Sequence, residues 1–319
     1  MPQAAGMHGF CRRDDAQTMN PIRFDERVVV VTGAGGGLGR SHALALASRG
    51  AAVVVNDLGG DLKGQGSSAS AAEQVVAEIL AAGGQALASH DDIATQAGVS
   101  SLVSAAMNRF GRVDALINNA GIVRDKSLVK MDMADFEAVV RVHLTGSALC
   151  TRALWPIFQA RGYGRVVFTT SAAGLYGNFG QTNYAAAKMA LVGLMKALKE
   201  EGTRHGILVN AVAPVALTRM TEGVPLSQWM QEASPGKVSA ALVYLASDAC
   251  QHSGQIVTAG GGYFAGVQVV EGAGVRAGPH EATAEFVAQN WAQIQDMSAA
   301  RAFVNATDAL VSTFGPDRP

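Results

Sequence analysis

The chain alternates short apolar runs with longer segments of helical periodicity, and this alternation constrains the fold more than any other feature. The runs are continuously apolar rather than alternately apolar and polar, which is typical of strands buried on both faces of a parallel sheet. They span 28–33, 51–57, 85–92, 113–121, 164–171, 207–214 and 255–262. Helices are expected between them, over 40–50, 70–84, 97–110, 132–160, 182–202 and 237–249. The pattern predicts an α/β fold with a Rossmann-type, doubly wound parallel sheet.

No internal repeat or linker divides this pattern, so a single domain is expected over 21–262, followed by a C-terminal extension over 263–319. Residues 1–20 lack the apolar core of a signal peptide and are interpreted as a disordered tail or an upstream start. Residues 59–70 and 216–237 show little periodicity and are candidates for mobile loops, which in compact α/β enzymes are often functional.

The C-terminal extension is expected to be helical. Residues 281–297 place Val287, Trp291 and Ile294 on one stripe of a helix. An apolar stripe needs a surface to pack against, either on the domain itself or on a partner subunit. A homodimer or homotetramer would supply such a partner subunit.

Composition restricts the partners and the compartment. A formal net charge of −1 and a pI near 6.7 favour neither nucleic acid nor an acidic membrane surface as a partner. Three scattered cysteines, Cys11, Cys150 and Cys250, indicate a reducing, cytoplasmic compartment rather than a disulfide framework. No metal site is expected, because the histidines outside the candidate site have no ligand spacing. They include His42, His90, His205, His252 and His280.

A glycine-rich turn, TGAGGGLG (32–39), follows the first strand and opens the first helix. Gly33 would permit the tight turn, Gly37 would let the backbone approach a pyrophosphate, and Gly39 would let helix and strand pack closely. The helix N-terminus then offers free N–H groups to phosphate oxygens. This context favours a dinucleotide site over the alternative, a glycine-rich turn with no ligand.

Asp57 ends the second strand, about twenty residues beyond the glycine turn, at the place where a carboxylate binds the adenosine ribose. Its charge would repel a 2′-phosphate, and Lys63 is the nearest cation that could accommodate one. Asp57 therefore favours NAD over NADP as the cofactor. The alternative is an aspartate that only caps a turn at the end of the strand.

Tyr184 and Lys188 are four residues apart in an expected helix, so their side chains share a face. With TGAGGGLG (32–39), NNAG (118–121) and Ser171 before them, the chain resembles the short-chain dehydrogenase/reductase family over nearly its full length. The resemblance implies that Tyr184 is the catalytic acid/base and that Lys188 favours its phenolate and bonds the nicotinamide ribose. Ser171 would hold the substrate oxygen.

The resemblance also implies further contacts to the cofactor. These involve Leu38, Leu58, Asp92, Ile93, Asn119, Ala120, Gly121, Pro214, Val215, Leu217 and Thr218. Asn119 would lie against the cofactor, and the residues from Pro214 to Thr218 would flank the nicotinamide. The adenine contact is assigned to Asp92 and Ile93, but the neighbouring Asp91 leaves open a shift of this assignment by one residue.

Within the family, the strings 53–68, RVHLTG (141–146) and 176–188 resemble the (3R)-hydroxyacyl-CoA dehydrogenase parts of peroxisomal multifunctional enzymes of type 2. Many family members have asparagine at the place of His143, where it keeps a water for a proton relay. A histidine can carry protons near neutrality, so His143 either relays protons or only packs. Val215 stands where many members have glycine, which affects the geometry of the loop beside the nicotinamide.

The sequence thus predicts an NAD-dependent oxidoreductase that interconverts a (3R)-3-hydroxyacyl-CoA and its 3-oxoacyl-CoA. The first alternative is a 17β-hydroxysteroid or a CoA-activated sterol side chain as the substrate. A 3-oxoacyl-acyl-carrier-protein reductase is disfavoured by Asp57, because such enzymes usually pair with NADPH. A cofactor-binding scaffold without catalysis would not need Ser171, Tyr184 and Lys188 together.

Overall fold

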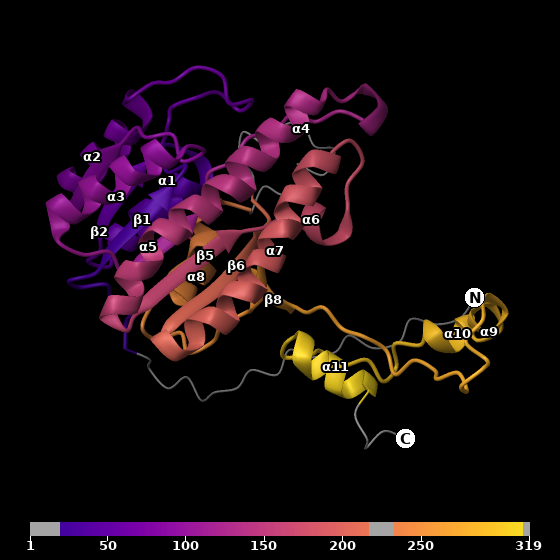
Figure 1. Ribbon diagram of the computed structural model, residues 1–319. Coiled ribbons are helices and arrows are strands. Elements are labelled where there is room, and N and C mark those ends of the chain that lie inside the picture. The colour runs from indigo at the N-terminus through magenta and orange to yellow at the C-terminus, as the bar shows by residue number, and fades with distance from the viewer. Residues whose placement is uncertain (1–19, 217–232, 315–319) are drawn as a thin grey trace, which may run out of the picture.

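The computed structural model describes residues 20–216 and 233–314, which are organised around one eight-stranded sheet (Figure 1). The strand order is β3-β2-β1-β4-β5-β6-β7-β8. The strands are β1 (Val28–Thr32), β2 (Ala52–Asn56), β3 (Gln85–Ser89), β4 (Ala115–Asn118), β5 (Gly164–Thr169), β6 (Ile207–Pro214), β7 (Ile256–Gly260) and β8 (Tyr263–Val267). All pairs up to β6–β7 are parallel. The predicted doubly wound parallel sheet is confirmed, and its strand order reverses at β1 and β4, where such folds bind ligands.

Helices cover both faces of the sheet (Figure 1). One face is covered by α1 (Gly37–Ala47), α2 (Ser70–Ala81) and α8 (Pro235–Ala246), and the other by α3 (Gln96–Phe110), α5 (Ser147–Arg161) and α7 (Thr182–Gly202). In β1, Val29 and Val31 pack into the first layer, whereas Val28 and Val30 pack into the second. Because successive side chains of a strand point to opposite faces, burial on both faces requires the continuous apolar run seen in the sequence.

The helix expected over 132–160 is present but not uniform. It comprises α4 (Met133–Val140), a six-residue π-helical segment η2 (Arg141–Gly146) and α5. The wider turn of η2 carries His143, and such π segments often occur at functional sites. Three shorter helices connect other elements. They are η1 (Leu128–Lys130), α6 (Ala172–Tyr176) and η3 (Thr203–His205).

The C-terminal part differs from the prediction in two respects. The single helix expected over 281–297 is divided into α9 (Ala284–Gln289) and α10 (Trp291–Ile294). The break lies at Asn290, whose backbone leaves helical geometry (ψ 11°) and whose Nδ2 donates to Phe286 O at 2.8 Å. In addition, β8, which pairs antiparallel with β7, and α11 (Ala306–Phe314) are not indicated by the sequence pattern.

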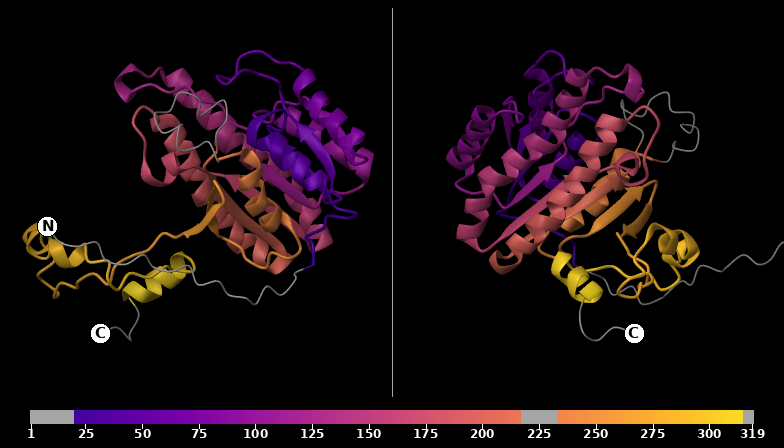
Figure 2. Two further views of the ribbon diagram at one scale, coloured as in Figure 1. Left: turned by 180° about the vertical axis from the view of Figure 1, so that it is seen from behind. Right: turned by 45° about the vertical axis from the view of Figure 1, so that its right-hand side comes forward.

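Beyond β8 the chain leaves the sheet, and Figures 1 and 2 show α9, α10 and α11 to one side of the domain. Hydrogen bonds connect the segment before α11 with α7, from Lys199 Nζ to Val304 O (2.8 Å) and from Asn305 Nδ2 to Glu200 Oε2 (3.1 Å). Val287 and Trp291 are about half exposed (45% and 56%). Packing of this stripe on a partner subunit therefore stays a prediction. No helix in the described part of the chain is long and apolar enough to cross a membrane.

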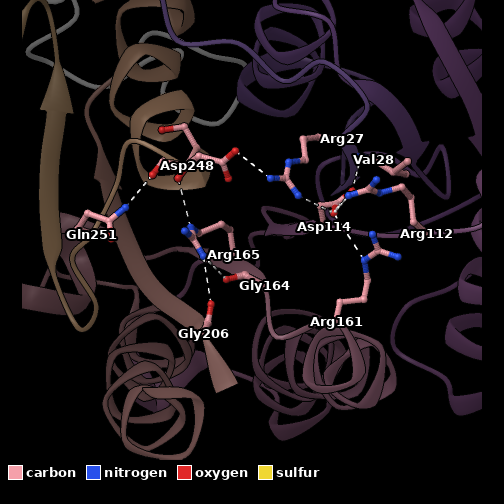
Figure 3. Close-up of polar contacts among 11 residues, drawn as sticks. Arg27, Val28, Arg112, Asp114, Arg161, Gly164, Arg165, Gly206, Asp248 and Gln251 are labelled. Atoms are coloured by element: carbon pink, nitrogen blue, oxygen red, sulfur yellow. Dashed lines mark hydrogen bonds and ion pairs between the residues drawn. The ribbon is translucent and has the colours of Figure 1, made fainter. Parts of the chain in front are cut away.

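A charged network lies at the amino ends of the central strands (Figure 3). Asp114, whose side chain is only 2% exposed, accepts hydrogen bonds from Val28 N (2.9 Å), Arg112 Nε (2.8 Å) and Arg27 Nη1 (3.3 Å). Arg27 also pairs with Asp248 at 2.9 Å. A buried carboxylate with several charge-assisted partners connects the starts of β1 and β4 and so stabilises their register.

We expect Asp114→Ala to lower the free energy of unfolding by roughly 3 kcal/mol, because the variant removes a buried charge from several donors at once. Urea denaturation of the cofactor-free protein measures this. Asp25→Ala is the control, since it breaks the exposed Arg23–Asp25 pair and should leave the midpoint nearly unchanged. Equal midpoints for the two variants would show that the buried network stabilises the sheet no more than a surface ion pair does.

Candidate active site

The carboxyl ends of the central strands surround a cavity of about 540 Å³. Most of the residues assigned to the cofactor or to catalysis from the sequence line this cavity. They are Gly33, Gly37, Leu38, Gly39, Asp57, Leu58, Asp92, Ile93, Asn119, Ala120, Gly121, His143, Tyr184, Lys188 and Pro214. Asp91, the alternative to Asp92, lines it too. Leu217 and Thr218 lie outside the described residues. Val215 is not part of the lining and instead donates its N–H to Ala259 O at 2.8 Å.

The glycine turn after β1 lies against the segment after β4. Gly33 has a left-handed φ of 63°, and a Cβ there would lie 2.6 Å from Ala120 Cα. At Gly39, a Cβ would lie 2.0 Å from Gly33 O. Asn119 Nδ2 donates to the carbonyl oxygens of Thr32 and Gly33, each at 3.0 Å. The glycines therefore let the turn pack tightly against the segment after β4 while Gly33, Gly37 and Gly39 line the cavity, an arrangement that is typical of a pyrophosphate-binding turn.

Asp57 lies at the end of β2 on the rim of the cavity. Its Oδ2 accepts from Gly35 N and its Oδ1 from Gly59 N, both at 2.7 Å. These two bonds hold the carboxylate next to the glycine turn. Because each carboxylate oxygen has further acceptor capacity, both oxygens can still accept from ribose hydroxyls.

The three residues assigned to catalysis come from neighbouring elements. Ser171 follows β5 and caps α6 by accepting from Ala173 N at 3.2 Å, whereas Tyr184 and Lys188 lie on one face of α7. Lys188 Nζ lies 5.5 Å from the centroid of the Tyr184 ring and donates to Thr169 O at 2.6 Å. The structure thus brings Tyr184 and Lys188 together, and Ser171 is close enough to the Tyr184 hydroxyl to influence its pKa. Their catalytic roles stay predictions.

Burial changes the acidity of this pair. It lowers the pKa of Lys188 to about 7, because the ammonium is taken out of water. Burial also raises the pKa of Tyr184, while the hydrogen bond with Ser171 opposes that rise. At neutral pH, Tyr184 therefore carries its proton in the absence of cofactor, and Lys188 is close to its midpoint.

His143 is almost fully buried within the π-helical segment. Its Nε2 lies 2.8 Å from Ile122 O and 3.1 Å from Ile122 N, and its ring meets that of Tyr184 edge-on, with centroids 5.2 Å apart. Burial, with a smaller contribution from the Lys188 charge, lowers the pKa of His143 to about 3. Gly121 makes room for the ring, because a Cβ there would lie 2.2 Å from Cε1. The imidazole is neutral at physiological pH.

Three contributions to this site were not identified from the sequence. Asn183 is completely buried, donates to Arg124 O at 3.0 Å and accepts from Tyr184 N at 2.7 Å. Thr169 provides the carbonyl for Lys188, and Ile122 provides the backbone groups for His143. Only Asn183 had a possible signal, its position directly before Tyr184. The others act through their backbone, which no residue type reveals.

Comparison with known proteins identifies the family. Residues 27–228 match the family described as short chain dehydrogenase. The chain belongs to the short-chain dehydrogenase family. It is 46% identical to mouse peroxisomal multifunctional enzyme type 2 over 281 residues, which cover 88% of this chain and 38% of the mouse protein.

Two solved structures extend the comparison. The structure of full-length peroxisomal multifunctional enzyme type 2 from Drosophila melanogaster aligns with a TM-score of 0.77 and 36% identity, covering 92% of this chain and 49% of that one. A 7α-hydroxysteroid dehydrogenase complexed with NADH and 7-oxo glycochenodeoxycholic acid aligns with a TM-score of 0.68 and 32% identity, covering 75% of this chain and 95% of that one. This chain therefore spans less than half of the length of each multifunctional enzyme. The likeness shows an oxidoreductase that takes a nicotinamide nucleotide and a small-molecule substrate.

We expect Gly39→Ala to weaken NADH binding at least about tenfold, because the added Cβ would force the first turn of α1 away from Gly33 O. Titration by NADH fluorescence measures the dissociation constant. Gly193→Ala is the matched control, since a Cβ there has nothing within 4 Å and α7 gains helix propensity. Unchanged affinity in Gly39→Ala would show that the close approach at this turn is not needed for the nucleotide.

Proposed function

We propose that this chain is an NAD-dependent oxidoreductase that interconverts a (3R)-3-hydroxyacyl-CoA and its 3-oxoacyl-CoA. The observation that carries the proposal is that Asp57, Tyr184 and Lys188 line one cavity, with the Ser171 side chain close enough to Tyr184 to influence its pKa. The acyl-CoA assignment rests on the resemblance of 53–68 and RVHLTG (141–146) to the hydroxyacyl-CoA dehydrogenase branch. Identity of 46% to the mouse multifunctional enzyme supports it.

The cavity fits a nicotinamide dinucleotide. Gly33 and Gly39, where a Cβ would collide with neighbouring backbone, keep the turn in the shape that opens α1 at the cavity for a pyrophosphate, and Asp57 offers acceptors to the adenosine ribose. A carboxylate in that position would repel a 2′-phosphate, so NAD is the proposed cofactor rather than NADP. When bound, the nicotinamide accepts or donates the hydride.

The side chains would move the proton. In the oxidation, the Tyr184 Oη takes the proton of the substrate hydroxyl, whose oxygen Ser171 Oγ holds by a hydrogen bond. Tyr184 must first become a phenolate, which the buried Lys188 ammonium favours by its charge. In the reduction the phenol returns its proton to the substrate oxygen. His143, being neutral, supports the Tyr184 ring edge-on and does not store a proton.

A hydroxysteroid is the second candidate substrate. It is favoured by the alignment with 7α-hydroxysteroid dehydrogenase, whose structure contains a 7-oxo bile acid conjugate. A reductase of acyl-carrier-protein substrates remains less favoured because of Asp57.

Assembly and compartment are also proposals. We expect a homodimer or homotetramer in which a partner covers the half-exposed Val287 and Trp291. Cys150 and Cys250 are free and buried, which is compatible with the reducing, cytoplasmic compartment expected from the sequence. The multifunctional relatives carry the word peroxisomal in their names, so a peroxisome is the alternative compartment.

A substrate and cofactor panel tests the proposed function. We expect NADH to form when the enzyme is mixed with NAD⁺ and a (3R)-3-hydroxyacyl-CoA, and not with the (3S) epimer. NAD⁺ should exceed NADP⁺ in kcat/KM by at least about tenfold, owing to the charge of Asp57. Turnover of a hydroxysteroid without turnover of any acyl-CoA would transfer the assignment to the second candidate.

We expect Tyr184→Phe to lower kcat by roughly a hundredfold to ten-thousandfold, which is the usual contribution of a general acid or base. NADH binding should be retained, because the ring stays in place and only the hydroxyl is lost. Tyr263→Phe, on the exposed strand β8, is the control and should keep full activity. Retained turnover in Tyr184→Phe would remove Tyr184 from the mechanism.

A further inference from the structure

Residues 58–68, the loop between β2 and α2, form an ordered strap. Ser68 N donates to Leu58 O at 3.1 Å and closes the base of the loop. Within it, Asp61 Oδ1 accepts from the backbone N–H groups of Lys63 and Gln65, both at 2.9 Å. The loop therefore has a defined shape, maintained from within by the Ser68–Leu58 backbone bond and by the Asp61 carboxylate.

The strap crosses the dinucleotide cavity. Its base is held at the end of β2, where Gly59 N donates to Asp57 Oδ1. Its tip is held after β4, where Val123 N donates to Leu62 O at 2.9 Å and Arg124 Nε donates to Lys63 O at 2.8 Å.

The strand order shows what lies beneath the strap. Because β1 lies between β2 and β4, a loop that connects the ends of those two strands passes over the glycine turn that follows β1. The strap lines one side of the cavity with Leu58, Gly60, Asp61, Leu62 and Gly64, and Ile122 and Arg124 line another. A dinucleotide seated on the glycine turn would therefore lie under the strap.

Arg124 connects the strap to the catalytic helix. Its Nη1 pairs with Asp135 Oδ1 of α4 at 3.1 Å, so the guanidinium contacts α4 and the strap together. Its carbonyl oxygen accepts from Asn183 Nδ2 at 3.0 Å, and Asn183 Oδ1 accepts from Tyr184 N at 2.7 Å. Arg124 thus contacts the strap, helix α4 and Asn183, the residue directly before Tyr184.

We propose that Arg124 is a positioning residue that holds the strap closed over the bound dinucleotide and sets the rate at which the dinucleotide leaves. The inference rests on the proposed function for the identity of the occupant. Among the residues that the structure describes, the tip of the strap is held by one backbone bond and one bond from the Arg124 guanidinium. Segments held by so few exposed hydrogen bonds open at low free-energy cost, and losing one of the two would shift the strap toward its open form.

Stopped-flow displacement of NADH tests the proposal. We expect Arg124→Met to raise the NADH dissociation rate about tenfold, the effect of one lost charge-assisted hydrogen bond, with a smaller change in the association rate. Gly64→Ala should also raise it, because φ is 76° there and a Cβ would lie 3.0 Å from the Ile122 side chain. Wild-type dissociation rates in both variants would overturn the proposal.

Lys126→Met is the matched control. Lys126 Nζ pairs with the same carboxylate, Asp135 Oδ2 at 3.1 Å, and no hydrogen bond or ion pair connects it to the strap in the described part of the chain. Its dissociation rate should stay at the wild-type value. An equal increase in Lys126→Met and Arg124→Met would show that the charge on Asp135, and not the hold on the strap, controls release.

Hydrogen exchange of the cofactor-free protein separates this proposal from the proposed function. The Val123 amide donates to the strap, so its exchange reports opening of the tip directly. We expect faster exchange at Val123 in Arg124→Met and an unchanged rate in Lys126→Met. Unchanged exchange at Val123 in Arg124→Met would refute the role of Arg124 in holding the strap, even if the protein binds NADH. Failure of the wild type to bind NADH would refute only the proposed cofactor.

Discussion

The site depends on how closely the turn after β1 approaches the segment after β4. At Gly33 and Gly39 the backbone of the turn is within contact distance of Ala120 and Asn119, and no side chain could be inserted. This approach places the start of α1 under the cavity and brings the residues after Asn119 to the same edge. Gly121, in the same segment after β4, is required for a related reason: a Cβ there would collide with the His143 ring. The glycine turn and the cavity wall beside His143 thus both depend on close packing at glycines.

Burial then determines the electrostatics of the site. Both Tyr184 and Lys188 are shifted toward their neutral forms, Tyr184 upward and Lys188 downward in pKa, because each charged form loses hydration. A phenolate and an ammonium formed together would attract each other at short range in a poorly hydrated cavity. The positive charge of an oxidised nicotinamide would act in the same direction. Burial therefore shifts both groups toward their neutral forms, and the attraction between phenolate and ammonium opposes that shift.

The sequence predicted the features that depend on local pattern. The continuous apolar runs gave the parallel sheet, and the glycine spacing gave the turn at the switch point. The break at Asn290 and the antiparallel strand β8 were not predicted, because Asn290 is compatible with a helix and β8 gains its pairing from β7. The separation of four residues in a helix predicted that Tyr184 and Lys188 lie close together.

The parts of the site that the sequence did not predict are contacts between segments far apart in the chain. Arg124 reaches Lys63 across 61 residues and Asn183 across 59, and the bonds to Lys63 O and from Asn183 use backbone carbonyls. A residue type says nothing about which backbone group will face it. Loop 59–70 was interpreted as mobile for the same reason: its glycines lack periodicity, and its order comes from Asp61 and from the distant Val123.

The contacts of His143 limit the chemistry that its ring can perform. Its Nε2 faces both polar groups of Ile122, but a neutral imidazole nitrogen either donates to the carbonyl or accepts from the N–H. In both tautomers Nδ1 has no hydrogen-bond partner among the described residues. Protonation would place a second positive charge beside Lys188, and burial already opposes it. The neutral imidazole is therefore suited to orient Ile122 and the Tyr184 ring, and a role for His143 in a proton relay stays a prediction.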